Sequence, residues 1–479
     1  MNQRYPEAHT YWPASYSFLC MGAALVAVLL ITGFFGVQAL PPEWMMVNIG
    51  VLSLFFILLN IVSVRSEPTG DESYAGKLFW MALIARVVAV FALVSLAELT
   101  WDRPFYVGAV DETRYHRVAT EVAQIITDGN FSLIIPHLLH EYMGLFDNIG
   151  VPLILGPVYA LFGNSVIVGK LFFALMGTGT VVLVYKTTRL IWDESVARLA
   201  GILMAFFPLA LFYSSVILKE EFVAFLVMLG IYILVKGVIN NRLGFWDIVL
   251  LLFAMSFIFL FRTAAGALLV TLVAGTFVFN RFGGSKVFSL FTVGAVFLIF
   301  YYFMDMFVEL DQYFDRITGV DEYSEARVRN VARGNVLATI VGTPVYVVLS
   351  FVAPFPSMVQ TSLRFDVTHD ATYYWVSGLM IWNFLAYFGI IGLWKAFTGK
   401  FSESLPVWGF AAGYSVILGI TALFTVVRFN YNAMPLFIIL IAVGIKYRHE
   451  FPYWKLWLPC AVVLIVAWNF FRLAGRGAL

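Results

Sequence analysis

Four polar residues that could take part in catalysis lie close together in the longest polar stretch of the chain. Asp111, Glu112, Arg114 and Tyr115 open the segment DETRYHRVATEVAQIITDG. A carboxylate in such a place can orient or deprotonate an attacking hydroxyl group as a general base. Carboxylates are also favoured at the start of a helix by the helix dipole, so a helix-capping role for Asp111 is the alternative that the residue types leave open.

Further charged residues interrupt apolar runs later in the chain. Lys219, Glu220 and Glu221 lie between two apolar runs. Ionisable residues at membrane depth are costly and usually functional, although at the edge of a membrane they can simply reach water. Arg428, in VVRFNYNAMP, and Arg262, in FLFRTAAG, each allow two interpretations. A guanidinium group can extend to the membrane interface, or it can clamp phosphate oxygens in a bidentate manner.

The composition indicates that lipid is the solvent for much of this chain. Of its 479 residues, 61% are hydrophobic and 12% are charged, and its mean hydropathy is +0.87. Soluble domains carry about 25% charged residues. The net charge of +1 gives no indication of nucleic-acid binding. Cys20 and Cys460 lie in separate apolar segments, so the sequence predicts neither a disulfide framework nor a zinc site.

A spanning helix needs about 20 mostly apolar residues, and about thirteen runs of this kind are present. They lie near 14–38, 43–64, 77–99, 165–186, 195–217, 221–240, 244–261, 263–280, 287–309, 373–395, 405–427, 429–446 and 455–472. We expect the first run to be a retained span, because no small-residue cleavage site follows it. We expect residues 1–76 to form an accessory hairpin and residues 77–479 to form the core.

The basic residues between these runs predict the orientation of the chain. Loops rich in lysine and arginine stay in the cytoplasm. The basic residues that we expect on that side are Arg65, Lys77, Lys186, Arg189, Arg198, Lys236, Arg242, Arg281, Lys286, Lys395, Lys400, Lys446 and Arg448. They share one side if the N-terminus is inside and residues 147–163 do not cross.

The opposite side then carries three long outer loops, 100–164, 310–335 and 354–372. In the first loop, apolar residues recur at helical spacing over 115–126, which predicts an amphipathic helix lying on the membrane surface. The segment 150–163 is short and contains two prolines, which favours a juxtamembrane or re-entrant helix. The segment 336–353 has a similar character, and whether either segment spans the membrane stays open.

The first outer loop resembles that of lipid-linked glycosyltransferases of the GT-C superfamily, most of all the lipid A aminoarabinose transferase and the protein O-mannosyltransferases. There an acidic pair and an Arg-Tyr precede a juxtamembrane helix, which is followed by Gly, an aromatic residue and Pro-His. The matching residues here are Asp111, Glu112, Arg114, Tyr115, Gly129, Phe131, Pro136 and His137. The segments around SSVILKEEFVAF and RFNYNAMPLFIILIAVGI resemble later blocks of the family.

This resemblance implies an all-α, GT-C-like membrane enzyme that moves a sugar from a polyprenyl-phosphate donor to an acceptor, with inversion at the anomeric carbon. It implies catalytic roles for Asp111 and Glu220. The residues expected to bind substrate are Glu112, Arg114, Tyr115, Lys219, Glu221, Arg262 and Arg428. No cofactor is assigned. A divalent metal is compatible with the family, but Gly150-Val151 stands where relatives carry an acidic residue, and Asp147 is the nearest carboxylate.

The expected partners are the lipid-linked donor, the bilayer, and a glycan, lipid or protein acceptor, with no nucleic acid. The expected location is a bacterial inner membrane, with the active site on the periplasmic face. An O-antigen polymerase or ligase is the first alternative, which the arginines and acids of 310–335 would suit. A transporter or flippase is the second, which predicts internal repeats and broken helices with charges near the membrane midplane.

Overall fold

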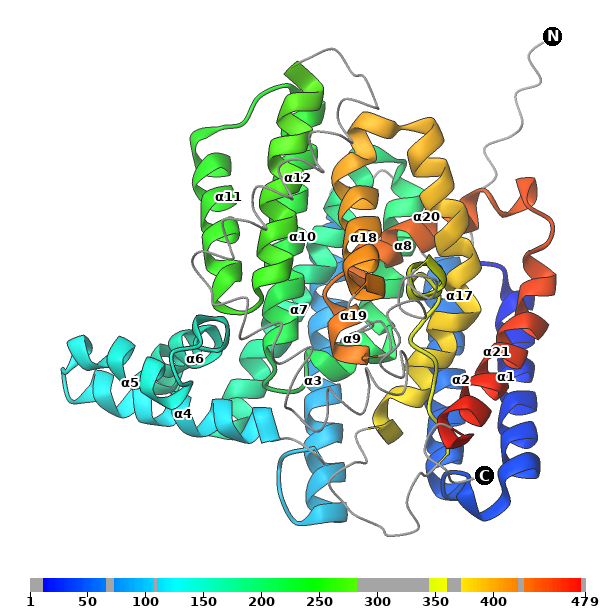
Figure 1. The fold of residues 1–479 in the computed structure, drawn as a ribbon, viewed down its shortest axis with the longest axis horizontal. Coiled ribbons are helices and arrows are strands. Elements are labelled where there is room, and N and C mark those ends of the chain that lie inside the picture. Colours follow the sequence, from blue (N-terminus) through cyan, green and yellow to red (C-terminus); the bar gives the residue numbers. More distant parts are fainter. Residues whose placement is uncertain are drawn as a thin grey trace.

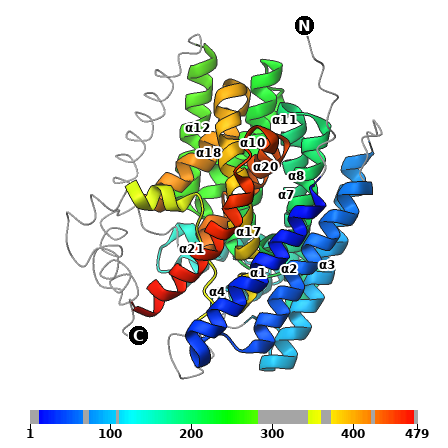
Figure 2. The same cartoon turned by 90° about the vertical axis from the view of Figure 1, so that its right-hand side faces the viewer.

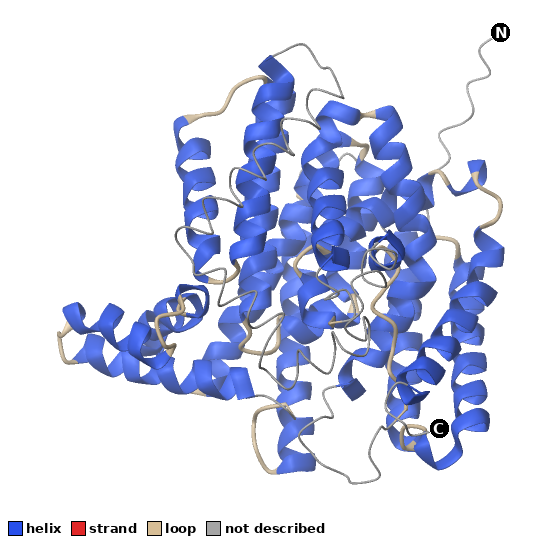
Figure 3. Ribbon diagram, in the orientation of Figure 1, coloured by secondary structure: helices blue, strands red, loops and turns tan. Residues whose placement is uncertain are grey.

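The computed structural model describes residues 12–65, 73–106, 110–281, 344–359, 372–420 and 426–474. Within these ranges the regular structure is helical (Figure 3), and an isolated antiparallel bridge joins Ala39 to Val359. The predicted all-α architecture is therefore confirmed. The outer loop 310–335 and the predicted span 287–309 lie outside the described residues, as does most of the loop 354–372.

Seven helices of the described residues are long and apolar enough to cross a membrane. These are α1 (Ala14–Phe35), α2 (Pro42–Arg65), α3 (Tyr74–Trp101), α7 (Val166–Ile191), α10 (Lys219–Asn240), α17 (Thr372–Gly399) and α21 (Trp454–Ala474). The other α-helices are α4 (Val110–Thr127), α5 (Ile134–Glu141), α6 (Gly150–Phe162), α8 (Glu194–Phe206), α9 (Pro208–Tyr213), α11 (Phe245–Phe257), α12 (Thr263–Arg281), α18 (Phe401–Ile420), α19 (Val427–Tyr431) and α20 (Met434–Lys446). The 3-10 turns that matter below are η3 (Phe146–Asn148) and η4 (Ile258–Leu260). The total of thirteen spans stays a prediction.

Two predicted continuous helices are each broken near a proline. The run 195–217 forms α8 and α9, with Phe207 in an extended conformation before Pro208. The run 429–446 forms α19 and α20, with Pro435 in the first turn of α20. Proline lacks an N–H group and disfavours a helical conformation at the preceding residue, which accounts for the end of α8 before Pro208. Pro435 lies in the first turn of α20, where a missing N–H group is tolerated. The continuous helices predicted from these runs are wrong.

The centre of the bundle depends on close helix contacts at glycine. A Cβ atom on Gly392 of α17 would lie 1.8 Å from the Leu440 carbonyl oxygen of α20, and one on Gly444 would lie 1.9 Å from the Phe388 carbonyl oxygen. Small residues let helix backbones approach in this way within membranes. Around this pair, α3, α7, α8 and α10 pack side by side (Figure 1).

The N-terminal hairpin packs on this core. Helix α1 lies along α21, and α2 packs on α17 and α8 (Figure 2). The Tyr16 hydroxyl donates a 2.6 Å hydrogen bond to the Phe384 carbonyl of α17. The Ser377 backbone N–H donates to Asn48 Oδ1 of α2 at 2.8 Å. The hairpin therefore shares hydrogen bonds with the helices that carry the core.

Helices α4, α5 and α6 form an arm that projects from one end of the bundle (Figure 1). The predicted amphipathic helix is confirmed as α4, and it buries Tyr115, Val118 and Val122. Val122 packs on α6 at Gly156, where a Cβ atom would lie 2.4 Å from Val122 Cγ1. The apolar face of α4 is therefore covered by α6. With 13 residues, α6 is too short to span a membrane, in line with a juxtamembrane helix.

Basic residues from distant parts of the sequence meet at the other end of the bundle. Lys446 pairs with Asp193, and Lys400 donates to the Ile191 carbonyl. Arg189 pairs with Glu194 at 3.0 Å. The residues that were predicted to share one side of the membrane therefore meet at one end of the bundle in these cases, opposite the arm.

We predict that Gly392→Ala lowers the stability of the bundle by about 2 kcal/mol, because the added methyl group forces α17 away from the α20 backbone. The measurement is the midpoint of thermal unfolding in detergent. Gly389→Ala is the matched control on the same helix, since its Cβ atom would meet Ile441 at an ordinary 3.5 Å. Equal midpoints for the two variants would contradict the close contact.

Candidate active site

The start of α4 brings Asp111 to the far C-terminal part of the chain. Asp111 Oδ2 lies 2.7 Å from Arg428 Nη1 of α19. Both side chains are about half exposed, at 49% and 44%. Asp111 lies inside the first turn of α4, where the helix dipole also favours its charge. The acid and the arginine that the sequence separates by more than 300 positions therefore form one ion pair.

A second ion pair lies deeper at the same end. Glu220, in the first turn of α10, is 1% exposed, and its Oε1 accepts a 2.9 Å hydrogen bond from Arg262 Nη2. The Arg262 and Arg428 guanidinium groups both lie over the ring of Phe429, at 4.3 and 5.3 Å from its centroid. One aromatic ring thus holds two cations close to two carboxylates.

Glu112 points into the bundle and is fully buried. Its Oε1 lies 2.8 Å from Lys170 Nζ of α7 and accepts a 3.0 Å hydrogen bond from the backbone N–H of Ile217. Lys170 is itself only 1% exposed. The adjacent residues Asp111 and Glu112 therefore have different roles. Asp111 faces the solvent-accessible site, whereas Glu112 anchors the arm to the bundle.

Lys219 connects the site to the turn before α6. Its ammonium group donates to the Asp147 carbonyl at 3.0 Å and to Asn148 Oδ1 at 2.6 Å. The Tyr115 hydroxyl also reaches Asn148 Oδ1, at 3.5 Å. Tyr115 is buried, and burial raises the pKa of its hydroxyl well above its ordinary value. Lys219 and Tyr115 therefore meet at one side-chain amide.

Close packing explains why position 150 is a glycine. A Cβ atom there would lie 2.7 Å from the Phe261 ring and 2.8 Å from the Leu260 carbonyl oxygen. The packing of α6 against η4 therefore leaves no room for a side chain at this place. Among the described residues, no three acidic, histidine or cysteine side chains gather closely enough to hold a metal ion. Metal use stays a prediction.

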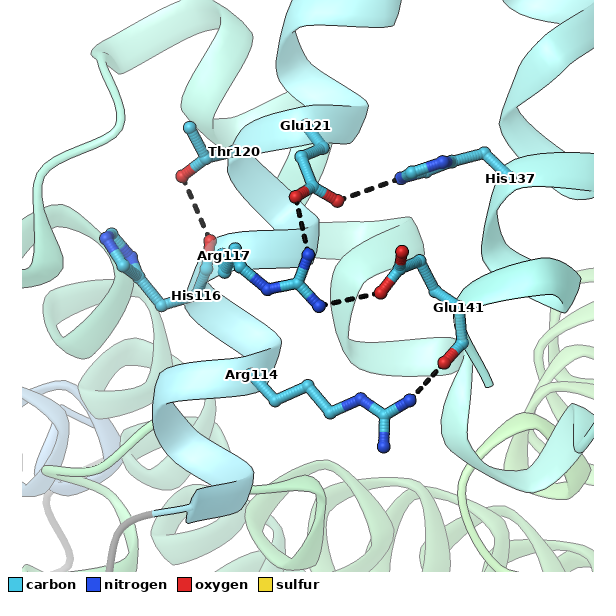
Figure 4. Close-up of polar contacts among 7 residues, drawn as sticks. All are labelled: Arg114, His116, Arg117, Thr120, Glu121, His137 and Glu141. Atoms are coloured by element: carbon cyan, nitrogen blue, oxygen red, sulfur yellow. Dashed lines mark hydrogen bonds and ion pairs between the residues drawn. The ribbon is translucent and has the colours of Figure 1, made fainter. Parts of the chain in front are cut away.

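Arg114 lies apart from the other candidates, on the arm. It donates to the Glu141 carbonyl and lies over the Tyr142 ring at 4.6 Å. Beside it, Arg117 pairs with Glu121 and Glu141 at 2.7 Å each (Figure 4). These contacts join α4 to α5. The structure therefore does not bring Arg114 to the ion pairs at the end of the bundle.

Glu221 is placed differently from its neighbour Glu220. It is fully buried, and both of its oxygens have partners. Oε2 accepts a 2.6 Å hydrogen bond from the Tyr431 hydroxyl, and Oε1 accepts one from Thr180 at 3.2 Å. This carboxylate faces the interior of the bundle.

Several residues of this region were not identified from the sequence. Lys170 and Arg86 each interrupt an apolar run, and that interruption is the signal that could have pointed to them. Tyr106 carries no such signal. Burial raises the pKa of its hydroxyl, and the carboxylates of Glu112 and Asp111 raise it further, so Tyr106 lies beside the acidic residues.

The site brings together the groups that a reaction needs when it moves a proton and binds an anion. A half-exposed carboxylate can accept a proton, and two arginines and a lysine can hold an anion. Because these groups lie at the edge of an apolar bundle, their interactions are stronger than in bulk water. The loop 310–335, on which the polymerase interpretation depends, lies outside the described residues.

We predict that Lys170→Met destabilises the folded protein by about 3–5 kcal/mol, because it leaves the Glu112 carboxylate buried without its cation. Thermal unfolding in detergent measures the change. Lys186→Met, an exposed position on the same helix, is the matched control. Adding Glu112→Leu to Lys170→Met should restore much of the loss, and no recovery would contradict the pairing.

Comparison with known proteins finds a family model that matches one segment of the chain. The model of the family described as dolichyl-phosphate-mannose-protein mannosyltransferase matches residues 148–306. This segment contains Lys170, Glu220 and Arg262, whereas Asp111 and Arg428 lie outside it. No curated protein matches the chain.

One similar solved structure is the archaeal oligosaccharyltransferase AglB from Archaeoglobus fulgidus, in complex with an inhibitory peptide and a dolichol-phosphate. The sequence identity is 14% and the TM-score is 0.42. The match covers 85% of this chain and 56% of that chain, so this chain spans little more than half of that protein. Over residues 148–306, the family match confirms the resemblance to protein mannosyltransferases that the sequence predicts.

Proposed function

We propose that this protein transfers a sugar from a polyprenyl-phosphate donor to the hydroxyl or amine group of an acceptor, at the end of the bundle that carries Asp111. The observation that carries the proposal is the 2.7 Å contact between Asp111 and Arg428, with Arg262 over the same Phe429 ring. A carboxylate beside two guanidinium groups suits a reaction that removes a proton at one point and leaves a phosphate at another.

In the proposed reaction, Asp111 accepts the proton of the acceptor nucleophile as that atom attacks the anomeric carbon. The bond from this carbon to the phosphate oxygen breaks on the opposite face, which inverts the configuration. Arg428, Arg262 and Lys219 stabilise the negative charge that develops on the leaving phosphate. Glu220 holds Arg262 in place through its 2.9 Å hydrogen bond. The products are the glycosylated acceptor and the lipid phosphate.

The ion pair of Asp111 with Arg428 links donor binding to the base. A donor phosphate that engages Arg428 competes with Asp111 for the same guanidinium group. Donor binding then releases the Asp111 carboxylate from its ion pair, so that it can accept from the acceptor nucleophile.

The lipid donor fits the position of these groups. The site lies at an end of the bundle rather than within it, so a phosphate can meet the arginines while its polyprenyl chain stays in the bilayer. The basic residues gather at the opposite end, which supports an extracytoplasmic site under the positive-inside rule. We place the protein in a bacterial inner membrane, with a glycan, lipid or protein as the acceptor.

We predict that Asp111→Asn lowers the transfer rate about 10²- to 10⁴-fold, because the amide cannot accept the proton. The assay follows the release of lipid phosphate from radiolabelled polyprenyl-phosphate sugars by purified protein, with a membrane extract as the acceptor. Asp128→Asn is the matched control, since Asp128 is exposed just after the same helix.

Either of two results would change this assignment. Full activity of a folded Asp111→Asn variant would move the base elsewhere, first to Glu220. Absence of turnover by the wild type with every donor would favour a transporter, to which the broken α8–α9 pair and the buried Arg86 are also suited.

We predict that Arg428→Lys lowers kcat/KM for the donor about 10- to 100-fold, because a lysine cannot bind the phosphate in a bidentate manner. Initial rates over a range of donor concentrations measure the effect. Arg242→Lys, an exposed position near the basic end of the bundle, is the control. Equal kinetics for Arg428→Lys and the wild type would remove Arg428 from the phosphate site.

A further inference from the structure

An arginine in the middle of α3 occupies a place that the α8–α9 break creates. Arg86 is fully buried, and its guanidinium group donates to the carbonyl oxygens of Met204 and Ala205 at 3.3 Å each. The Met204 carbonyl would normally accept from the N–H group four residues later, but that residue is Pro208. Arg86 therefore satisfies the Met204 carbonyl that the proline leaves without a partner, together with the adjacent Ala205 carbonyl at the end of α8.

The charge of Arg86 is balanced by Glu221. Both groups lie against Gly177 of α7. A Cβ atom on Gly177 would lie 2.8 Å from Arg86 Nε and 3.2 Å from Glu221 Oε1. Burying either ion alone would be costly, so the opposite charges support each other. Glycine at this position is what allows them to approach.

Glu221 in turn holds α19. Its Oε2 accepts the 2.6 Å hydrogen bond from the Tyr431 hydroxyl. The Tyr431 ring also packs on Tyr213, with centroids 4.2 Å apart. Tyr431 follows Arg428 by one helical turn on this helix of five residues. A short helix has little stability of its own, so contacts of its side chains determine how it lies.

We propose that Arg86, Glu221 and Tyr431 form a buried positioning chain that orients α19, so that Arg428 and Phe429 face Asp111 and Arg262. This proposal rests on the proposed function and adds positioning residues that touch no substrate. The chain joins α3, α10 and α19, and the α8–α9 break supplies its first anchor. A hydrogen bond to a carboxylate has a fixed direction, which an apolar contact in the same place would lack.

A double-mutant cycle tests whether Tyr431 acts through Arg428. Tyr431→Phe should lower kcat/KM for the lipid donor about tenfold, mainly through a higher KM. In an Arg428→Ala background, the same change should cost less than about twofold, because the residue that it positions is gone. Tyr185→Phe is the matched control, since Tyr185 donates a similar 2.8 Å hydrogen bond to Glu194 at the other end of the bundle. Equal losses in both backgrounds would overturn the proposal.

A second measurement keeps the proposal testable if the wild type transfers no sugar. In a Cys460→Ser background, both residues of the surface ion pair are replaced by cysteine, as Asp111→Cys with Arg428→Cys. A short bis-maleimide then cross-links the two introduced cysteines. Tyr431→Phe should slow this cross-linking several-fold, while Tyr185→Phe leaves its rate unchanged. An unchanged rate with Tyr431→Phe would overturn the positioning role, whatever reaction the protein performs.

Discussion

Among the described residues, the buried carboxylates at the arm end of this bundle lie close to cations from other helices. Glu112 pairs with Lys170 and Glu220 with Arg262, while Glu221 and Arg86 both lie against Gly177. Away from water, an ion without a partner would cost several kcal/mol, so these pairs strongly restrict how the helices can lie relative to one another. The Glu112–Lys170 pair anchors the arm to the bundle in this way. In the proposed positioning chain, the place of the short α19, and with it the surface pair of Asp111 and Arg428, depends on the same buried set.

The sequence predicts the features that depend on local patterns. Apolar runs of sufficient length mark the long helices, and helical spacing of apolar residues marks α4. The charged residues that interrupt apolar runs at 219–221, 262 and 428 do meet at one end of the bundle. Their types and places are visible in the sequence because a charge in an apolar run is rare. Which acid meets which cation is not visible, since each pair joins distant segments.

The parts that sequence reasoning missed depend on three-dimensional packing. The separate placement of Asp111 and Glu112 follows from the turn of a helix, which directs adjacent side chains to different sides. The prolines at 208 and 435 are visible in the sequence, but the consequence of the break at Pro208 is not. The Met204 carbonyl that Pro208 leaves without its helical partner accepts from Arg86, more than a hundred residues earlier. The need for glycine at position 150 appears only when α6 meets η4.

The two guanidinium groups over Phe429 have a consequence for the end of the proposed catalytic cycle. Each guanidinium group is already paired with a carboxylate, Asp111 or Glu220, and a more highly charged anion competes better for these cations. The proposed donor is a phosphodiester with a single negative charge, whereas the lipid product of the proposed reaction is a phosphomonoester with about −1.5 to −2. The product would then be the tighter ligand of the two. Sustained turnover in the membrane would depend on whatever process removes the spent carrier.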